Sequence, residues 1–398
     1  MIIPRQSGNP PLHLTYCMNI HPGEDWQSVL DAVKTYAPAV RARLKHDGPF
    51  GLGLRLSAEA AATLEQGDNV PAFRDHLADH GLYAFTINGF PYGQFHGTRV
   101  KEHVYEPDWS TAERLDYTRR LVRILTALLP EDVPGSISTL PGTYGRNIPA
   151  EARAAILRNL LDAGTYCAEV SEGNGRECRL AIEPEPGCLW ESTEDLVRLF
   201  AVDLPRESKT TGAANATVRR GLGVCLDTCH MAVLYEDIPE AMRRLKEHEI
   251  PIAKIQLSAG LICPNDAEAL KQLESFDEPV YLHQCAVRSV QSMLRFADLH
   301  NALSAVAELD EWNEMRTHFH VPLFADRYGA LRSTGTLLGS EFFDLVKSAT
   351  CRNLEVETYS FQALPEQHRS DNVIENVAKE LGWVLGQLES TKATMPPG

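Results

Sequence analysis

One stretch in the middle of the chain is the most informative about its architecture: Gly223-Val224-Cys225-Leu226-Asp227-Thr228-Cys229-His230. An apolar run ends there in a carboxylate, Asp227, and an imidazole, His230, follows three residues later. A short apolar run of this kind is typical of a strand that is buried on both faces. The stretch therefore predicts that Asp227 lies at the C-terminal lip of a buried strand and that His230 lies on the loop just beyond it.

Two further apolar runs end in a carboxylate in the same way. Glu183 closes the run Leu180-Ala181-Ile182-Glu183-Pro184, and Glu357 closes the run Leu354-Glu355-Val356-Glu357-Thr358. One such glutamate alone would more simply cap a helix or pair with an arginine. Buried carboxylates are costly unless they pair or hold a metal, and the C-terminal strand ends of a parallel barrel meet at one face. Three of them therefore predict a divalent-metal site at that face.

Apolar strands alternate with helical stretches along most of the chain, which is typical of a parallel α/β fold. Helices are expected to begin near Asp25, Ser110 and Ser192. The predicted strands lie near residues 12–20, 51–56, 83–88, 136–140, 179–184, 222–227, 252–257 and 353–358. Eight strands with helical crossovers predict a (β/α)8 TIM barrel. An open doubly wound sheet is the alternative, but no Gly-x-Gly-x-x-Gly turn opens the first helix.

The alternation breaks at two places. The composition of residues 203–220 predicts an exposed, mobile loop. Residues 259–335 form a long insertion between the seventh and eighth strands, and its extended apolar pieces are residues 280–285 and 318–324. Loops of this length in a compact domain are usually functional or disordered. We interpret residues 1–390 as one TIM-barrel domain and residues 391–398 as a flexible tail.

Side chains alternate between the two faces of a strand, and in these strands one face is apolar while the other carries polar or small side chains. In residues 51–56, for example, the leucines alternate with Gly51, Gly53 and Arg55. We expect the apolar face to pack against the helices and the side chains of the other face to fill the barrel interior. Lys254 lies two residues inside the end of the seventh strand, and Glu355 lies two residues inside Glu357 on the eighth. This spacing predicts a buried Lys254–Glu355 ion pair one layer below the metal.

Composition limits the classes of function. The chain has 398 residues, 43% of them apolar, and a formal charge of -16. The negative charge argues against a protein whose main function is to bind nucleic acid. The first residues lack the apolar core of a signal peptide, and no segment reaches the ~18 apolar residues of a transmembrane helix. The nine cysteines include no Cys-x-x-Cys pair. A reduced, cytoplasmic compartment is therefore expected.

Further polar residues are candidates for the same face. His230 would be a second ligand or would orient the first ligands. Gln256 ends the seventh strand, and its amide oxygen can bind a hard cation weakly. His318 and His320 alternate on an extended segment of the insertion. Such a pair is more often a surface feature, but its position on a loop at the barrel lip makes a site equally plausible.

These motifs resemble those of the endonuclease IV and xylose-isomerase-like TIM-barrel superfamily. The resemblance rests on the run 223–230, on the Ile-Glu-Pro-x-Pro-Gly and Val-Glu-Thr strand ends, and on the order Glu, Asp-x-x-His, Gln/His, His-x-His, Glu. The whole chain more closely resembles the EboE family of metabolite-traffic proteins. That likeness includes Thr15-Tyr16-Cys17-Met18-Asn19-Ile20-His21-Pro22-Gly23-Glu24 and His318-Phe319-His320-Val321-Pro322.

The resemblance implies a set of metal ligands: Glu183, Asp227 and Glu357, with Gln256 where many relatives have His. It also implies that His230, His318 and His320 match positions that bind further zinc ions in the nuclease branch. Leu140 stands where that branch has a zinc-binding His, and Gln is a poorer zinc ligand than His. One or two ions of Mn, Zn or Mg are therefore expected rather than a three-zinc cluster.

The EboE resemblance implies a role in secondary-metabolite biosynthesis or precursor traffic, beside partners that include a prenyltransferase-like membrane protein. Our first hypothesis is a metal-dependent isomerase or epimerase of a small polyol- or cyclitol-like metabolite. In it, Glu183 or Glu357 moves a proton as general base, and the other carboxylate is the acid or a ligand. The residues expected to bind the substrate are His21, Arg55, His96 and Lys254. The alternatives are a binding or carrier protein without turnover and an endonuclease IV-like phosphodiesterase.

Overall fold

The computed structural model describes residues 1–5, 8–95, 101–309, 311–361, 364–366 and 372–390. His96 and the expected tail 391–398 lie outside these described residues. Within them, no helix combines the length and the apolar character that a membrane crossing needs.

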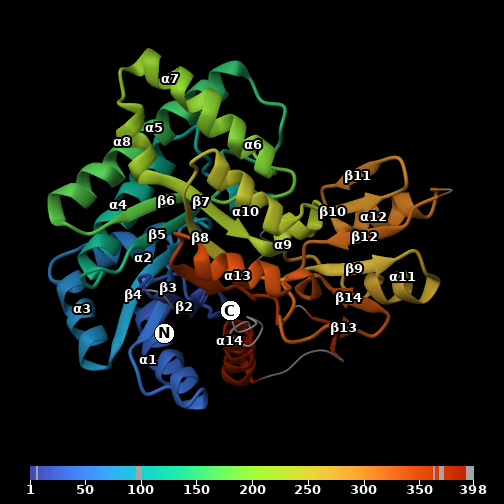
Figure 1. Ribbon diagram of the computed structural model, residues 1–398, viewed down its shortest axis with the longest axis horizontal. Coiled ribbons are helices and arrows are strands. Elements are labelled where there is room, and N and C mark those ends of the chain that lie inside the picture. Colours follow the sequence, from blue (N-terminus) through green and yellow to red (C-terminus); the bar gives the residue numbers. More distant parts are fainter. Residues whose placement is uncertain (6–7, 96–100, 310, 362–363, 367–371, 391–398) are drawn as a thin grey trace, which may run out of the picture.

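The main sheet has nine strands in the order β1-β2-β15-β8-β7-β6-β5-β4-β3. Eight of them are parallel: β2 (Leu12–Tyr16), β3 (Phe50–Arg55), β4 (Leu82–Asn88), β5 (Gly135–Thr139), β6 (Cys178–Ile182), β7 (Leu222–Asp227), β8 (Ile252–Leu257) and β15 (Asn353–Val356). The short β1 (Ile2–Ile3) pairs antiparallel with β2. A parallel bridge between Cys17 and Gly53 joins β2 to β3 and brings the ring together. The predicted (β/α)8 barrel is confirmed (Figure 1).

Helices surround this ring: α1 (Trp26–Arg43), α2 (Ala58–Leu64), α3 (Asn69–Asp79), α4 (Ala112–Leu128), α5 (Ala150–Asn174), α6 (Thr193–Arg198), α7 (Leu204–Thr211), α8 (Asn215–Gly221), α9 (Thr228–Val233), α10 (Ile238–Glu247), α13 (Ser340–Ser348) and α14 (Val373–Ser390). The expected helix starts are present. Asp25 caps α1 by accepting from Ser28 N–H, and Thr111 caps α4. Ser192 and Asp195 form a capping box at α6.

Two local predictions were wrong. Residues 203–220 are largely helical, because Leu204 and Val218 are buried and hold α7 and α8 against α5. The polar composition of that segment conceals these two apolar anchors. His230 lies in the short helix α9 rather than on a loop. Asp227 causes this difference, since its Oδ1 accepts from the N–H groups of Cys229 (2.8 Å) and His230 (3.0 Å) and so starts a helix.

The insertion folds into a second, antiparallel sheet in the order β11-β10-β12-β9-β14-β13, beside the barrel in Figure 1. Its elements are β9 (Leu261–Pro264), α11 (Ala267–Glu274), β10 (Cys285–Arg288), β11 (Met293–Phe296), α12 (Leu299–Val306), β12 (Glu314–Thr317), β13 (Arg327–Tyr328) and β14 (Leu331–Ser333). The two extended pieces predicted here lie mostly outside these strands. Residues 318–324 instead leave β12 and return to the barrel, where Val321 N–H donates to Ala259 O (2.8 Å).

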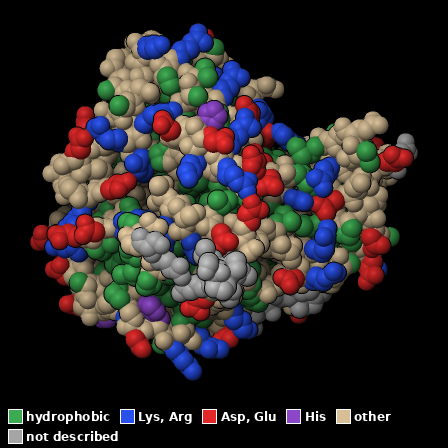
Figure 2. Space-filling model, in the orientation of Figure 1, with side chains coloured by type: hydrophobic (Ala, Val, Ile, Leu, Met, Phe, Trp, Pro, Cys, Tyr) green, Lys and Arg blue, Asp and Glu red, His purple; other side chains and the backbone are tan. Residues whose placement is uncertain are grey.

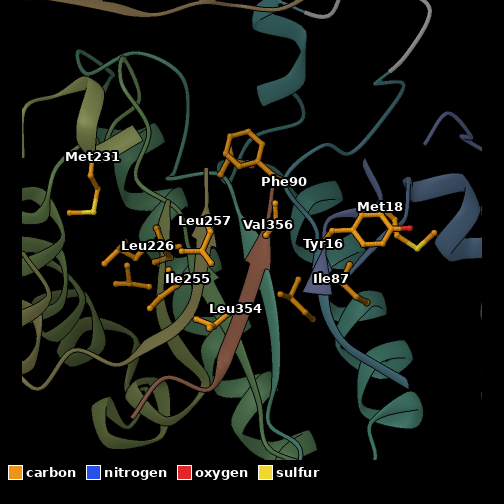
Figure 3. Packing of buried hydrophobic residues seen from close by; sticks show 14 of the residues in the cluster. Tyr16, Met18, Ile87, Phe90, Leu226, Met231, Ile255, Leu257, Leu354 and Val356 are labelled. Carbon is orange, nitrogen blue, oxygen red and sulfur yellow. The ribbon is translucent and has the colours of Figure 1, made fainter. Parts of the chain in front are cut away.

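The two faces of the barrel strands divide as expected. Leu354 and Val356 of β15 belong to the buried apolar cluster outside the ring, together with Ile255 and Leu257 of β8 (Figure 3). Inside the ring, Lys254 Nζ lies 2.5 Å from Glu355 Oε2, and neither side chain is exposed to solvent. This confirms the predicted ion pair. Gly53 leaves room for the pair, because a Cβ at that position would overlap the Glu355 carboxylate. The same Cβ would lie 2.9 Å from the Tyr16 carbonyl oxygen.

Candidate metal centre

Three carboxylates meet at the C-terminal ends of the barrel strands. Asp227 is the last residue of β7. Glu183 and Glu357 each follow a strand by one residue, and their N–H groups extend the parallel ladder to Thr139 O and Leu257 O, both at 3.0 Å. One oxygen from each carboxylate lies within 4.8 Å of the others, and all three side chains are buried. The structure thus brings together three residues that are far apart in the sequence.

Three histidines, His230, His318 and His320, lie beside these carboxylates. Hydrogen bonds at their Nδ1 atoms fix the orientation of each ring. The Nδ1 of His230 lies 2.9 Å from the backbone carbonyl oxygen of Pro184, and the Nδ1 of His320 lies 2.8 Å from the backbone carbonyl oxygen of Glu357. The Nδ1 of His318 lies 2.6 Å from the side-chain amide oxygen of Gln284. A carbonyl oxygen only accepts, so each Nδ1 must carry the proton. The lone pair then resides on Nε2, as a metal ligand requires.

Several of the buried atoms that could bind a metal ion have no hydrogen-bond partner among the described residues. They are Glu183 Oε2, Asp227 Oδ2, His318 Nε2 and His320 Nε2. Unpaired buried polar atoms are costly, and bound cations would give these atoms partners. The groups that could share an ion overlap: Glu183 with Asp227 and Glu357, Asp227 with His230 and His320, Glu185 with His230 and His318, and Cys229 with His318 and His320. These oxygen and nitrogen donors fit a divalent metal ion.

Electrostatics at the site follow from burial and from crowding of like charges. Burial, with the negative charges of Glu357 and Asp227, raises the pKa of Glu183 well above its ordinary value. Burial and Asp227 do the same for Glu357. Burial would raise the pKa of Asp227 too, but His230, His320 and the Ser258 hydroxyl hold it below its usual range. A divalent cation would offset this crowding.

Burial also favours the neutral form of His318 and His320. Burial lowers the pKa of His320 to about 4 and moves that of His318 well below its usual value. Neutral imidazoles are the form that binds metals.

Glu185, two residues after Glu183, is also part of this site. Its Oε1 accepts from the Tyr105 hydroxyl (2.7 Å) and from the Gln284 amide (2.8 Å). Gln284 also holds His318, so one side chain of the insertion orients two potential ligands. The signal in the sequence was the repeat Glu183-Pro184-Glu185-Pro186, but nothing local pointed to Tyr105 or Gln284.

Gln256 does not offer its oxygen to the site, contrary to the interpretation as a ligand. That oxygen accepts from the Cys225 thiol (2.5 Å), and the amide nitrogen donates to Glu357. Asn19 and Asn88 also donate to Glu357, each at 2.7 Å. Gln256 therefore helps these asparagines to position Glu357, a role that the strand pattern alone did not reveal.

Three of the residues predicted to bind substrate are described by the structure, and none of them lines the cavity. His21 stacks on Tyr36 with ring centroids 3.8 Å apart and bonds to the Tyr16 hydroxyl at 3.0 Å. Arg55 pairs with Glu24, and Lys254 lies below the cluster with Glu355. His96 is outside the described residues.

A cavity opens above the cluster and encloses about 530 Å³ of empty space, solvent at its mouth included. Its polar floor is formed by Asn19, Asn88, Glu183, Glu185, His230, His318, His320 and Glu357. Its other lining residues are Phe90, Pro91, Phe95, Lys101, Val104, Tyr105, Tyr281, Leu282 and Tyr359. The face of the protein seen in Figure 2 mixes Lys and Arg with Asp and Glu and presents no continuous basic surface.

Neither the known protein-family models nor the curated proteins give a match to this chain. Among solved structures, it is similar to an IolI protein with a bound zinc atom (12% identity, 96% of this chain and 100% of the other, TM-score 0.46). It is also similar to a D-tagatose 3-epimerase-like protein (11%, 96% and 98%, TM-score 0.47). A third is a family 2 AP endonuclease from Brucella melitensis (15%, 62% and 79%, TM-score 0.36). Likenesses this distant assign no activity to this chain.

Proposed function

We propose that this chain is a metal-dependent enzyme that isomerises or epimerises a small polyol- or cyclitol-like metabolite. The observation that carries the proposal is the set of four buried atoms without hydrogen-bond partners among the described residues, on Glu183, Asp227, His318 and His320, beneath a cavity. Buried polar atoms are usually hydrogen-bonded in a folded protein, and bound metal would supply the partners that these four lack.

Glu183, Asp227 and Glu357 would hold the metal, with the histidines beside them. A bound divalent ion would polarise a carbonyl or hydroxyl oxygen of the substrate. Three amide groups hold Glu357 in place, which leaves Glu183 as the better placed general base. Glu357 then serves as the oriented ligand or as the acid.

The resemblance to the EboE family supports a place in secondary-metabolite biosynthesis or precursor traffic, with a prenyltransferase-like membrane protein among the partners. All nine cysteines are free and buried, which supports a cytoplasmic location.

Elemental mass spectrometry of the purified protein tests this function. We expect near-stoichiometric metal in the wild type and its loss in Glu183→Ala and Asp227→Ala. Glu131→Ala is the matched control, because that side chain is 85% exposed and far in sequence from the cluster. A wild-type protein without metal after reconstitution would reject a metal enzyme and favour a carrier that uses the same cavity.

A phosphodiesterase is the second candidate, favoured by the overlapping ligand groups, which could hold more than one cation. Against it stand the net charge of -16 and the fully buried Leu140 where the nuclease branch has a histidine. Cleavage of abasic duplex DNA by the zinc-loaded protein would decide in its favour, and we expect none.

A further inference from the structure

The cavity lining has two chemically different parts. The carboxylates and histidines form one part. Phe95, Tyr281 and Tyr359 form the other, which we call the aromatic wall. Their ring centroids lie 5.5 Å apart for Phe95–Tyr281, 5.3 Å for Phe95–Tyr359 and 5.1 Å for Tyr281–Tyr359. Tyr359 also lies 4.7 Å from the His320 ring, so the wall begins where the ligand cluster ends.

Three separate segments build this wall. Phe95 follows β4, Tyr281 belongs to the insertion and Tyr359 follows β15. Phe95 is fixed from behind: its N–H donates to Glu24 Oε1 (2.8 Å), and the Arg55 guanidinium lies 5.9 Å from its ring centroid. Arg55 in turn pairs with Glu24. Arg55 is therefore a positioning residue for the wall. Such support indicates a preformed apolar surface rather than loosely packed loops.

Most polar groups of the lining outside the ligand cluster are already engaged. Asn88 donates to Glu357 and accepts from Phe90 N–H. The Tyr105 hydroxyl bonds to Glu185, and Lys101 pairs with Asp298 at 2.5 Å. Of the described lining, this leaves the Asn19 oxygen, which has no partner, and the hydroxyls of the two wall tyrosines. A molecule with hydroxyl groups on every side would lose the hydrogen bonds of these groups to water on binding. The cavity would not replace all of them with hydrogen bonds to the protein.

We propose that the substrate is a small ring with its oxygens on one edge and an apolar face on the other. The oxygens meet the carboxylates and histidines, and the apolar face lies against Phe95, Tyr281 and Tyr359. The inference rests on the proposed function and narrows its substrate class, from polyols in general to rings that carry only one oxygenated edge.

Two six-membered rings serve as probes: cis-1,2-cyclohexanediol, which has one oxygenated edge, and myo-inositol, which has hydroxyls all round. Titrations followed by saturation-transfer NMR would use the metal-loaded protein, with the metal content of each sample measured. We expect the diol to bind at least about tenfold more tightly, since myo-inositol would leave hydroxyl groups without partners in the cavity.

A pair of substitutions at Tyr281 separates the ring from its hydroxyl. Tyr281→Phe keeps the ring and should keep the preference for the diol, whereas Tyr281→Ser keeps a hydroxyl and should reduce diol binding about tenfold. Thermal melting of both variants checks that they fold.

The outcomes are distinct. Metal-loaded protein that binds myo-inositol as well as the diol, or that binds neither, would overturn the inference while the proposed function stands. Loss of binding in Tyr281→Phe but not in Tyr281→Ser would overturn it as well. A protein that takes up no metal would overturn the proposed function and the inference together.

Discussion

At the scale of single residues, the site depends on side chains that never touch the proposed ion. Gln284 illustrates this, because its amide oxygen accepts from His318 Nδ1 while its nitrogen donates to Glu185. Its orientation is unambiguous, since the same nitrogen also lies 3.2 Å from the Pro186 carbonyl, which can only accept. The side chain therefore sets both the tautomer of a histidine and the position of a carboxylate.

Replacing Gln284 with Leu should weaken metal binding about 10–100-fold, which is the usual cost of losing a partner that orients a ligand. Equilibrium dialysis with Zn²⁺ measures the affinity. Gln291→Leu is the control, since Gln291 lies exposed in the same insertion. An unchanged affinity in Gln284→Leu would show that the histidine orients itself.

The ion pair beneath the site gives a second prediction at this scale. Lys254→Met would leave Glu355 buried without its partner, and we expect a loss of about 3–5 kcal/mol in the free energy of unfolding. The double variant Lys254→Met/Glu355→Gln should recover most of it, because no uncompensated charge remains. Urea denaturation measures both. Unchanged stability and metal content in the single variant would remove any supporting role for the pair.

At the scale of elements, α14 is connected to the barrel mouth by one buried carboxyl group. Glu380 Oε1 accepts from the Thr358 hydroxyl (2.7 Å), just after Glu357, and from Leu323 N–H (3.0 Å), just after the histidine pair. Burial raises the pKa of Glu380 to about 8. The group thus links the final helix to two segments that carry proposed ligands.

This raised pKa predicts a pH dependence of stability. Between the ordinary pKa of 4.5 and about 8, the folded chain holds a proton on Glu380 that the unfolded chain has released. Stability from this group is therefore fully present below pH 4.5 and is lost as the pH rises through 8. Glu380→Gln cannot ionise and keeps the accepting oxygen, so it should be more stable than wild type at pH 8–9 and not at pH 5.

Urea denaturation across this pH range tests the prediction. Glu389→Gln is the control on the same helix, because Glu389 is exposed there. A constant difference between Glu380→Gln and wild type at every pH would contradict the assignment.

At the scale of the whole molecule, the proposed ligands come from β6, β7, β15 and the insertion, so the fold must be complete before the site exists. A ligand that binds only the folded chain stabilises it by mass action. Divalent metal at a hundredfold excess over its dissociation constant should therefore raise the free energy of unfolding by about 2.7 kcal/mol. The comparison is melting with added metal against melting with a chelator. Asp227→Ala should show no difference, and an equal shift in that variant would place the binding elsewhere.

The sequence by itself determined the barrel. The eight parallel strands are where the apolar runs predicted them, and the inward parity correctly paired Lys254 with Glu355. Both properties follow from the period of two within a strand and from the order of strands along the chain, which are local. The meeting of Glu183, Asp227 and Glu357 at one face follows from the same rule, because parallel strands end together.

Only the tertiary structure decided what surrounds those carboxylates. Glu185, Tyr105 and Gln284 form one network across three distant segments, and Gln256 turns its oxygen toward Cys225. The helix at His230 and the helices in residues 203–220 also depend on caps and buried anchors that composition hides. Contacts between segments far apart in the chain set these features, and no periodicity within a segment encodes which partner a side chain will meet.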